Sequence, residues 1–392
     1  MQEENQEENF ETLAIRLQAE RTHFKEHSVP LYLTSSYKFD DSEEMRALFA
    51  NEKEGNVYSR YANPNTSELI DKMAVLEGAE SGWVTATGMA AIFTTFAAFL
   101  QSGDHVLASR SVFGSTHQLL NNIFPKWGIT YTYADLDKPE QMEQGIQPNT
   151  KIIFVETPSN PGIDIIDLEW LAQLTKKHGV LLVVDNCFAT PYLQQPIKLG
   201  ADISIHSATK FIDGQGRTLG GVILGSHALI GEIEAFARHS GPAMSPFNAW
   251  LLSKSLETLA VRMDRHCENA LKVAEFLESH PRIKKVRYPF LPSHPQYDIA
   301  KKQMKQGGGI VTLVIEGGAA AAGKFMDSLK MFSISANLGD TRSIATHPAT
   351  STHSKLTEEQ RLEVGIEQGS VRLSIGLEHI NDILGDIKQA LS

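Results

Sequence analysis

The sequence predicts an α/β protein with a large, mostly parallel sheet and a smaller α/β unit at its C-terminal end. Short runs rich in Val, Ile and Leu alternate with helical stretches such as Asp167 to His178, a pattern typical of parallel sheets. Polar residues follow several of these runs, where parallel sheets place their ligands. The strands expected here are His105 to Ser109, Lys151 to Glu156, Val180 to Asp185 and Gly220 to Gly225.

The chain is expected to divide into three segments. Residues 1–60 form an extended N-terminal arm with a short helix, because they have few long apolar runs and cannot bury much surface against themselves. Residues 61–255 form the large domain and residues 256–392 the C-terminal domain, with an apolar helical stripe from Leu256 to Leu277 joining them and a hinge at Ser240 to Pro246. The C-terminal elements expected are a strand at Ile310 to Ile315, a helix at Ala319 to Leu329, a strand at Ser370 to Ile375 and a helix from Ile380.

Composition limits the class of partner. The formal charge of −11 argues against nucleic acid and anionic membranes, which bind basic surfaces. Two cysteines, Cys187 and Cys267, make neither a disulfide framework nor a zinc motif, so no metal site is expected. The apolar run from Met89 to Leu100 is too short to cross a bilayer, and the acidic N-terminus resembles neither a signal nor a transit peptide. We expect a cytoplasmic protein that acts on small molecules.

Lys210 follows a predicted strand at Asp202 to His206 and a short turn. Ser207, Thr209 and nearby glycines can partly remove this lysine from water. Such desolvation lowers the pKa of an amine and frees it to attack a carbonyl. The alternative is an ordinary solvated lysine in a polar turn, which is the commoner state of lysine.

Two further segments contain candidates for anion binding. Tyr58 and Arg60 lie on a loop before a predicted helix, where Asn65 and Glu68 have the spacing of a capping box. An arginine so placed can hold a phosphate or carboxylate, although a solvated loop arginine is the alternative. Gly88 lies between a strand-like segment and an apolar helix whose first N–H groups favour an anion. A purely steric glycine is the alternative there.

Three polar or aromatic residues stand after predicted strands: Phe113, Asn160 and Asp185. An acid that closes an apolar strand either caps the next turn or neutralises a cation. A desolvated lysine, a buried acid, an aromatic ring and an anion cradle together are what pyridoxal 5'-phosphate requires. Asp185 and Lys210 lie 210 − 185 = 25 positions apart, which suits two neighbouring strands with a short connection.

On these residues the chain resembles the Cys/Met-metabolism branch of fold-type I pyridoxal-phosphate enzymes. The blocks Tyr58-Ser-Arg60, Asp185-Asn186 and Ser207-Ala-Thr-Lys210 carry the resemblance, which extends from about Tyr37 to Leu391. It implies a fold-type I α/β enzyme with pyridoxal 5'-phosphate and with sites shared across a dimer, assembled as a tetramer.

The resemblance also implies a role for each candidate residue. Lys210 would be the catalytic lysine that forms a Schiff base with the cofactor. Asp185 would meet the ring nitrogen and Phe113 would stack on the ring. The other implied cofactor-binding residues are Gly88, Met89, Asn160, Ser207 and Thr209, with Tyr58 and Arg60 from the adjacent subunit; the implied substrate-binding residues are Arg372, Asn337 and Arg342.

Within this branch, the chain looks most similar to the O-succinylhomoserine sulfhydrylases. The signs are Asp213-Gly-Gln-Gly-Arg217, Asn337-Leu-Gly-Asp340 and the segment from Thr346 to His353. Two departures bear on chemistry: Phe113 replaces the branch's usual tyrosine, and Ser115 stands where methionine γ-lyases carry cysteine. A missing hydroxyl matters least when the leaving group is a stable carboxylate.

These observations favour exchange of the acyl group of O-succinylhomoserine for sulfide, which gives homocysteine. Cystathionine γ-synthase, O-acetylhomoserine sulfhydrylase and methionine or cystathionine γ-lyase are alternatives within the branch. A cofactor-free Schiff-base lyase and a non-enzymatic binding protein are alternatives from other classes. A succinyl ester carries a distal carboxylate that needs a cation when it leaves water. Arg217 and Arg342 are the candidates, and Arg342 is preferred.

Overall fold

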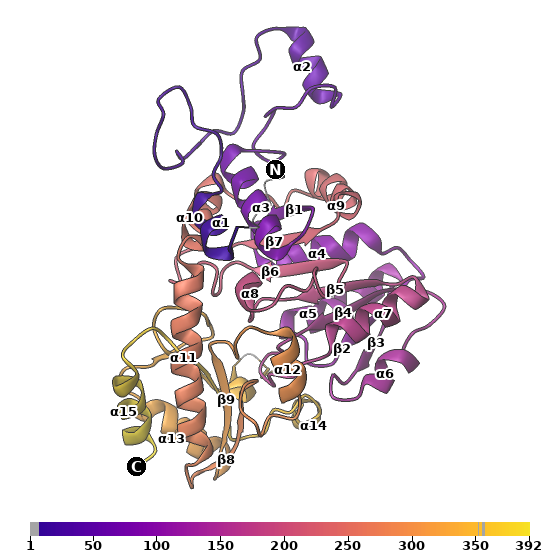
Figure 1. Ribbon diagram of the computed structural model, residues 1–392. Coiled ribbons are helices and arrows are strands. Elements are labelled where there is room, and N and C mark those ends of the chain that lie inside the picture. The colour runs from indigo at the N-terminus through magenta and orange to yellow at the C-terminus, as the bar shows by residue number, and fades with distance from the viewer. Residues whose placement is uncertain (1–7, 352, 355–356) are drawn as a thin grey trace, which may run out of the picture.

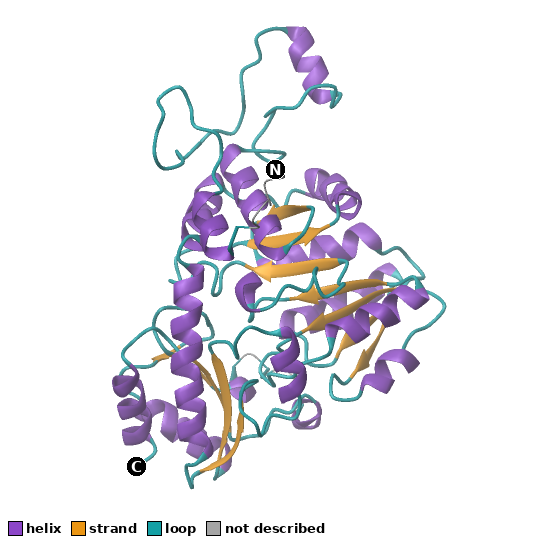
Figure 2. Cartoon of the chain, in the orientation of Figure 1, coloured by secondary structure: helices purple, strands orange, loops and turns teal. Residues whose placement is uncertain are grey.

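The computed structural model describes residues 8–351, 353–354 and 357–392. Figure 1 shows a body built on two sheets, with the helix labelled α2 standing away from it. No helix in the described ranges is long and apolar enough to cross a membrane. The strands of the two sheets lie in separate parts of the body, one containing the middle of the chain and the other its C-terminal part (Figure 2).

The first sheet contains seven strands. In spatial order they are β1 (Ser81–Thr85), β7 (Gly221–Gly225), β6 (Ile203–Ser207), β5 (Leu181–Asp185), β4 (Thr150–Glu156), β2 (His105–Ser109) and β3 (Thr130–Ala134). The five strands from β6 to β3 are parallel, whereas β7 is antiparallel to both β6 and β1. The four predicted strands are present, and the prediction of a mostly parallel α/β fold is confirmed.

Helices cover both faces of this sheet, because its central strands are apolar on both sides. One face packs on α4 (Gly88–Phe99) and α9 (His227–Ser240). The other face packs on α3 (Pro64–Glu77), α7 (Leu168–His178) and α10 (Pro246–Leu256). Shorter elements complete this part: α5 (Gly114–Gln118), a π-helical turn (Leu119–Ile123), a 3₁₀ turn (Phe124–Trp127), α6 (Pro139–Gln144) and α8 (Thr190–Leu193).

The second sheet has five strands, in the order β10 (Ser333–Ile334), β11 (Ile344–Thr346), β12 (Ser370–Ser374), β9 (Ile310–Ile315) and β8 (Ile283–Arg287). Its strands are antiparallel except for the β10–β11 pair. The helices of this part are α12 (Tyr297–Gln303), α13 (Gly318–Ser328), α14 (Glu358–Glu363) and α15 (Ile380–Ala390), with a 3₁₀ turn at Pro348–Thr350. The predicted C-terminal strands and helices are therefore present, and none of their predicted ends is wrong by more than one residue.

Helix α11 (Leu259–Glu278) joins the two parts. Its first half, including Leu259 and Met263, packs in the core of the first sheet, while Val273 and Leu277 pack in the core of the second. The hinge predicted at Ser240 to Pro246 is wrong, because α10 beyond it still packs in the first core with α3. The domain limits at residues 60 and 255 stay predictions.

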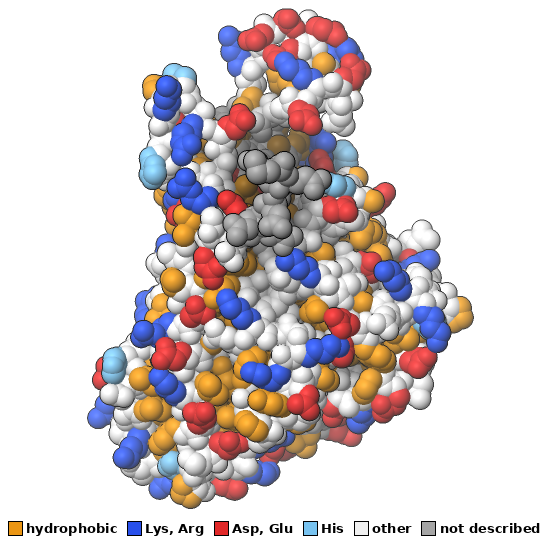
Figure 3. Space-filling view, viewed as in Figure 1, with side chains coloured by type: hydrophobic (Ala, Val, Ile, Leu, Met, Phe, Trp, Pro, Cys, Tyr) orange, Lys and Arg blue, Asp and Glu red, His pale blue; other side chains and the backbone are white. Residues whose placement is uncertain are grey.

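The N-terminal arm contains two helices, α1 (Phe10–Arg16) and α2 (Ser42–Phe49), where one was predicted. Ala14 of α1 is buried in the first core, and the Phe10 ring packs edge-on against Tyr192. Helix α2 projects from the body and carries acidic and basic side chains over its surface (Figures 1 and 3). The start of the arm therefore packs on its own chain, whereas α2 stands away from the body.

The predicted capping box at the start of α3 is wrong by two residues. Asn63 is the N-cap: its side chain accepts the Asn65 N–H at 2.9 Å, and the Asn63 N–H donates to the Thr66 hydroxyl at 3.1 Å. Asn65 instead binds the arm by accepting the Tyr32 N–H at 2.8 Å. Glu68 likewise accepts an arm N–H. The polar residues at the start of α3 thus hold the arm.

Candidate active site

The carboxyl ends of the parallel strands face the second sheet across a cavity of about 800 Å³. Glu156 and Asp185 are direct neighbours in the register of β4 and β5, and Lys210 follows β6. The second sheet contributes Arg372 from β12. Ten of the residues to which the resemblance gives a role line this one cavity: Gly88, Met89, Phe113, Asn160, Asp185, Ser207, Thr209, Lys210, Asn337 and Arg372.

Lys210 is partly desolvated, as the sequence suggested. Its Nζ donates a hydrogen bond to Asn337 Oδ1 at 2.9 Å, and no carboxylate within the described residues forms an ion pair with it. Burial lowers the pKa of the Lys210 amine, and the charge of Arg372 adds to this effect. The structure therefore favours a neutral amine at this position more strongly than water would.

Two buried carboxyl groups lie side by side beneath the cavity. Asp185 accepts the Cys187 N–H at 3.0 Å, and burial raises the pKa of its carboxyl to about 6. Burial and the neighbouring Asp185 charge raise the pKa of Glu156 well above its usual value. A bound cation would therefore be stabilised here, because it would offset the cost of ionising a buried acid. The nitrogen of a protonated pyridine ring is such a cation.

The N-terminus of α4 forms an anion corner. The Thr87 side chain caps the helix by accepting the Ala90 N–H at 3.0 Å, while the first N–H groups, at Gly88 and Met89, have no partner within a helix. A Cβ atom at Gly88 would lie only 2.6 Å from Ser207 Cβ and 2.7 Å from Ser207 Oγ. Glycine thus lets the helix end lie against a hydroxyl, as a phosphate site requires.

Arg372 lies at the other side of the cavity and is almost fully buried. Its Nη1 donates to Asn160 Oδ1 at 3.1 Å, and its Nη2 donates to the Asn337 carbonyl at 3.1 Å. Its Nε is buried and has no hydrogen-bond partner among the described residues. A buried, charged donor without a partner is costly, so this atom fits a substrate carboxylate.

Sequence reasoning missed several lining residues, among them Glu156 and Cys187. Glu156 Oε2 accepts the Phe113 N–H at 2.8 Å and so holds the predicted stacking residue. Its signal was its place at the end of a strand, which it shares with Asp185. Cys187 has its thiol 3.7 Å from the Ser207 carbonyl, and burial raises the pKa of that thiol. Cys187 had been considered only as a possible disulfide or zinc residue.

Three predicted site residues do not line this cavity. Tyr58 and Arg60 border a separate hollow beside residues 243–246, and the Arg60 guanidinium packs over the Tyr61 ring. Arg342 bonds Asp340 on the surface, with 66% of its side chain exposed. Arg342 does not line the cavity, and its role in substrate binding stays a prediction.

The fold and this cavity define a fold-type I pyridoxal-phosphate enzyme: the lysine, the buried acid and the anion corner fit the cofactor's aldehyde, ring and phosphate. The family described as Cys/Met metabolism PLP-dependent enzymes matches residues 11–392, so the chain belongs to that family. Its cofactor is pyridoxal 5'-phosphate. The two alternatives from other classes, a cofactor-free lyase and a non-enzymatic binding protein, are therefore wrong.

Individual relatives within the family are similar to this chain over nearly their whole length. The chain is 47% identical to an O-succinylhomoserine sulfhydrylase of Pseudomonas aeruginosa, over 98% of this chain and 95% of the relative. It is 44% identical to an O-succinylhomoserine sulfhydrylase of Mycobacterium tuberculosis, over 97% and 95%. It is also 40% identical to an L-methionine γ-lyase of Porphyromonas gingivalis, over 97% and 96%. These relatives have two different named activities, so sequence similarity alone does not identify the reaction of this chain.

Solved structures show the same architecture. The crystal structure of metB from Corynebacterium glutamicum matches with a TM-score of 0.93 and 39% identity over 98% of each chain. A putative O-acetylhomoserine (thiol)-lyase (metY) from Campylobacter jejuni matches with a TM-score of 0.94 and 36% identity, over 98% of this chain and all of that one. That structure contains N'-pyridoxyl-lysine-5'-monophosphate.

Proposed function

We propose that this enzyme replaces the succinyl group of O-succinylhomoserine with sulfide and releases homocysteine. One structural observation carries the choice within the family: Phe113, on the wall of the cavity, offers no hydroxyl. A leaving carboxylate needs no proton, whereas a leaving thiolate is helped by one. The O-succinylhomoserine sulfhydrylases among the relatives support the same choice.

Six of the cavity residues would hold the cofactor. Gly88, Met89, Ser207 and Thr209 would hold the cofactor phosphate, Asp185 the ring nitrogen and Phe113 the ring face. When bound, the cofactor withdraws electrons from the substrate Cα and so makes the adjacent C–H bonds acidic. The remaining steps need a base and a carboxylate anchor.

The chain's own groups supply both. Arg372 would bind the substrate α-carboxylate through Nε, while Asn160 and Asn337 fix its other nitrogens. Lys210 would then take the proton from Cα and move protons at Cβ, because burial lowers the pKa of its amine and so favours the neutral form, which can accept a proton. The succinate leaves from Cγ as an anion, and sulfide adds at the same carbon.

A second candidate is γ-elimination from a thioether, favoured by the relative named L-methionine γ-lyase. Cystathionine γ-synthase and O-acetylhomoserine sulfhydrylase differ from the proposal only in the nucleophile or the acyl group. All of these reactions would use Lys210 and Arg372 in the same way. The substrate must therefore be decided by an experiment.

We also propose that Tyr58 and Arg60 complete the site of a second subunit. They lie outside the Lys210 cavity, on the part of the chain that follows the projecting α2 (Figure 1). Tyr58 keeps 41% of its surface exposed although it is aromatic. A partner that covers this surface would make the dimer the smallest active unit, and two dimers would form the expected tetramer.

Product analysis tests the proposed reaction. The holoenzyme is supplied with O-succinylhomoserine and, in three separate reactions, with sulfide, with cysteine or with no nucleophile. Homocysteine from the first reaction at a rate well above the products of the other two supports the proposal. Cystathionine as the main product would assign the synthase, and 2-oxobutyrate at an equal rate without a nucleophile would assign the lyase.

A further inference from the structure

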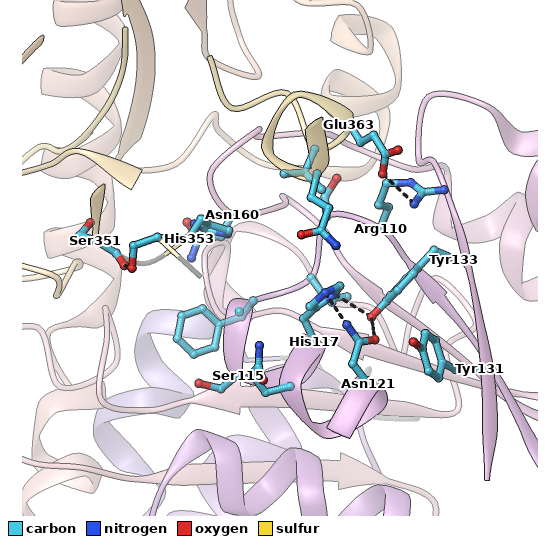
Figure 4. Close-up of a pocket in the computed structure, with 18 residues that line it drawn as sticks. Arg110, Ser115, His117, Asn121, Tyr131, Tyr133, Asn160, Ser351, His353 and Glu363 are labelled. Carbon is cyan, nitrogen blue, oxygen red and sulfur yellow. Dashed lines mark hydrogen bonds and ion pairs between the residues drawn. The ribbon is translucent and has the colours of Figure 1, made fainter. Parts of the chain in front are cut away.

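A second cavity, of about 390 Å³, adjoins the first and shares Phe113 and Asn160 with it. Figure 4 shows Asn160 and His353 at one end of this second cavity, with Arg110 and Glu363 at the other. Asn160 also bonds Arg372 in the first cavity. The second cavity thus leads away from the proposed carboxylate anchor.

Several hydrogen-bonded polar groups lie along the second cavity. Tyr133 donates to Asn121 at 3.0 Å and lies 2.7 Å from His117 Nδ1, and Asn121 Nδ2 lies 2.6 Å from His117 Nε2 (Figure 4). Burial, followed by the Arg110 charge, lowers the pKa of His117. Burial and the Arg372 charge lower the pKa of His353 to about 4. Among the described lining residues, Arg110 is the one arginine or lysine.

The Arg110 guanidinium is bonded on one side and can still bind a ligand on the other. Its Nε donates to Asp135 at 2.8 Å, and its Nη1 donates to Glu363 at a longer 3.3 Å. Glu363 keeps 51% of its side chain exposed, so water can replace this partner at little cost. Nη2 makes no hydrogen bond within the described part of the chain.

The two arginines considered from the sequence differ from Arg110 in this respect. Arg217 lines the first cavity, but a completely buried Asp213 accepts both its Nε and its backbone N–H. That carboxylate cannot release its cation without being left charged in the interior. Arg342 lines neither cavity and is held by Asp340. Only the Arg110 pair can open toward a cavity without leaving a buried charge.

We propose that the second cavity binds the acyl arm of the substrate, and that Arg110 determines specificity by binding the distal carboxylate of a succinyl ester in place of Glu363. This inference rests on the proposed function. The covalent chain of the ester runs from the anchor at Arg372, past Phe113 and Asn160, to the Arg110 end. An acetyl ester has no distal carboxylate, so Arg110 would not strengthen its binding.

The test compares kcat/KM for O-succinylhomoserine and O-acetylhomoserine, each with sulfide, in holoenzyme variants. Arg110→Ala should lower the succinyl-to-acetyl ratio about 10-fold, the lower end for a charge-assisted hydrogen bond, because Arg110 is partly exposed. Lys138→Ala is the matched control. Lys138 bonds the same Asp135 and carries the same charge, but it does not line this cavity. It should leave the ratio within about two-fold.

Glu363→Gln provides a test that keeps Arg110 intact. It removes the competing carboxylate and should raise the ratio several-fold. An unchanged ratio in both Arg110→Ala and Glu363→Gln overturns the inference, as does an equal drop in Lys138→Ala, which would indicate a general effect of surface charge.

A binding measurement separates this inference from the proposed reaction. Calorimetry of succinate with wild-type and Arg110→Ala holoenzyme needs no turnover, and about 10-fold weaker binding by the variant is expected. If neither ester gives homocysteine, the proposed function fails, while the succinate result still decides the role of Arg110. If both esters react and succinate binds the two proteins equally, only the role of Arg110 is wrong.

Discussion

Gly88→Ala tests the anion corner with a single methyl group. The added Cβ would lie 2.6 Å from Ser207 Cβ and 3.0 Å from Ser207 Cα, well inside van der Waals contact. Part of this clash is with the Ser207 backbone, so rotation of the serine side chain cannot relieve it. Overpacking of this kind costs about 1 to 3 kcal/mol. We expect the start of α4 to move away from Ser207, which separates the two sides of the phosphate site.

The assay is titration of the apoprotein with pyridoxal 5'-phosphate, followed by absorbance. An energetic cost of about 1 to 3 kcal/mol corresponds to roughly 5- to 150-fold weaker binding. Gly323→Ala is the matched control, because Gly323 lies inside α13 and a Cβ there meets nothing within 4 Å. It should bind cofactor normally and unfold at equal or higher denaturant. Wild-type affinity in Gly88→Ala would refute the phosphate site at this helix end.

Two further predictions concern charge and assembly. Burial raises the pKa of Asp185 to about 6, above its value in the unfolded chain, so the contribution of Asp185 to the stability of the apoprotein should fall as the pH rises from about 4 through 6. In urea unfolding, the free energy of unfolding of Asp185→Asn apoprotein should exceed that of wild type by on the order of 1 to 3 kcal/mol at pH 8. The difference should disappear at pH 4, and a difference independent of pH would contradict the raised pKa of Asp185. Mixing inactive Arg60→Ala with inactive Lys210→Ala should restore activity, because a hybrid dimer contains one intact site; hybrids that form and stay inactive would place Arg60 elsewhere.

The sequence was sufficient for residues whose position follows from local pattern. An apolar run that stops at a polar residue marks the end of a parallel strand, and this located Asp185 and Lys210 at one edge of the sheet. The same reasoning reached Gly88, since a glycine between a strand and an apolar helix is visible in the sequence. These residues lie together because neighbouring parallel strands end together.

Features that depend on packing between distant segments could not be predicted in this way. Arg110 and Glu363 are 253 residues apart, and their contact exists only because α14, in the part of the chain that contains the second sheet, lies next to the first part. Asn63 and Asn65 both bond the arm at Tyr32, a contact that no local pattern shows. The sequence does not show that Arg342 is paired with Asp340, because no sequence pattern gives the direction of the Asp340 side chain. Arg342 was therefore expected to be free to bind a succinyl carboxylate.

The most direct test of the central claim, that the cavity between the two sheets is the active site, is borohydride reduction of the purified holoenzyme followed by peptide mapping. The protein should be yellow and should lose this colour on reduction. The cofactor should then be found on one peptide, attached to Lys210. Attachment to any other lysine, or a colourless protein that is active without added pyridoxal 5'-phosphate, would contradict the account.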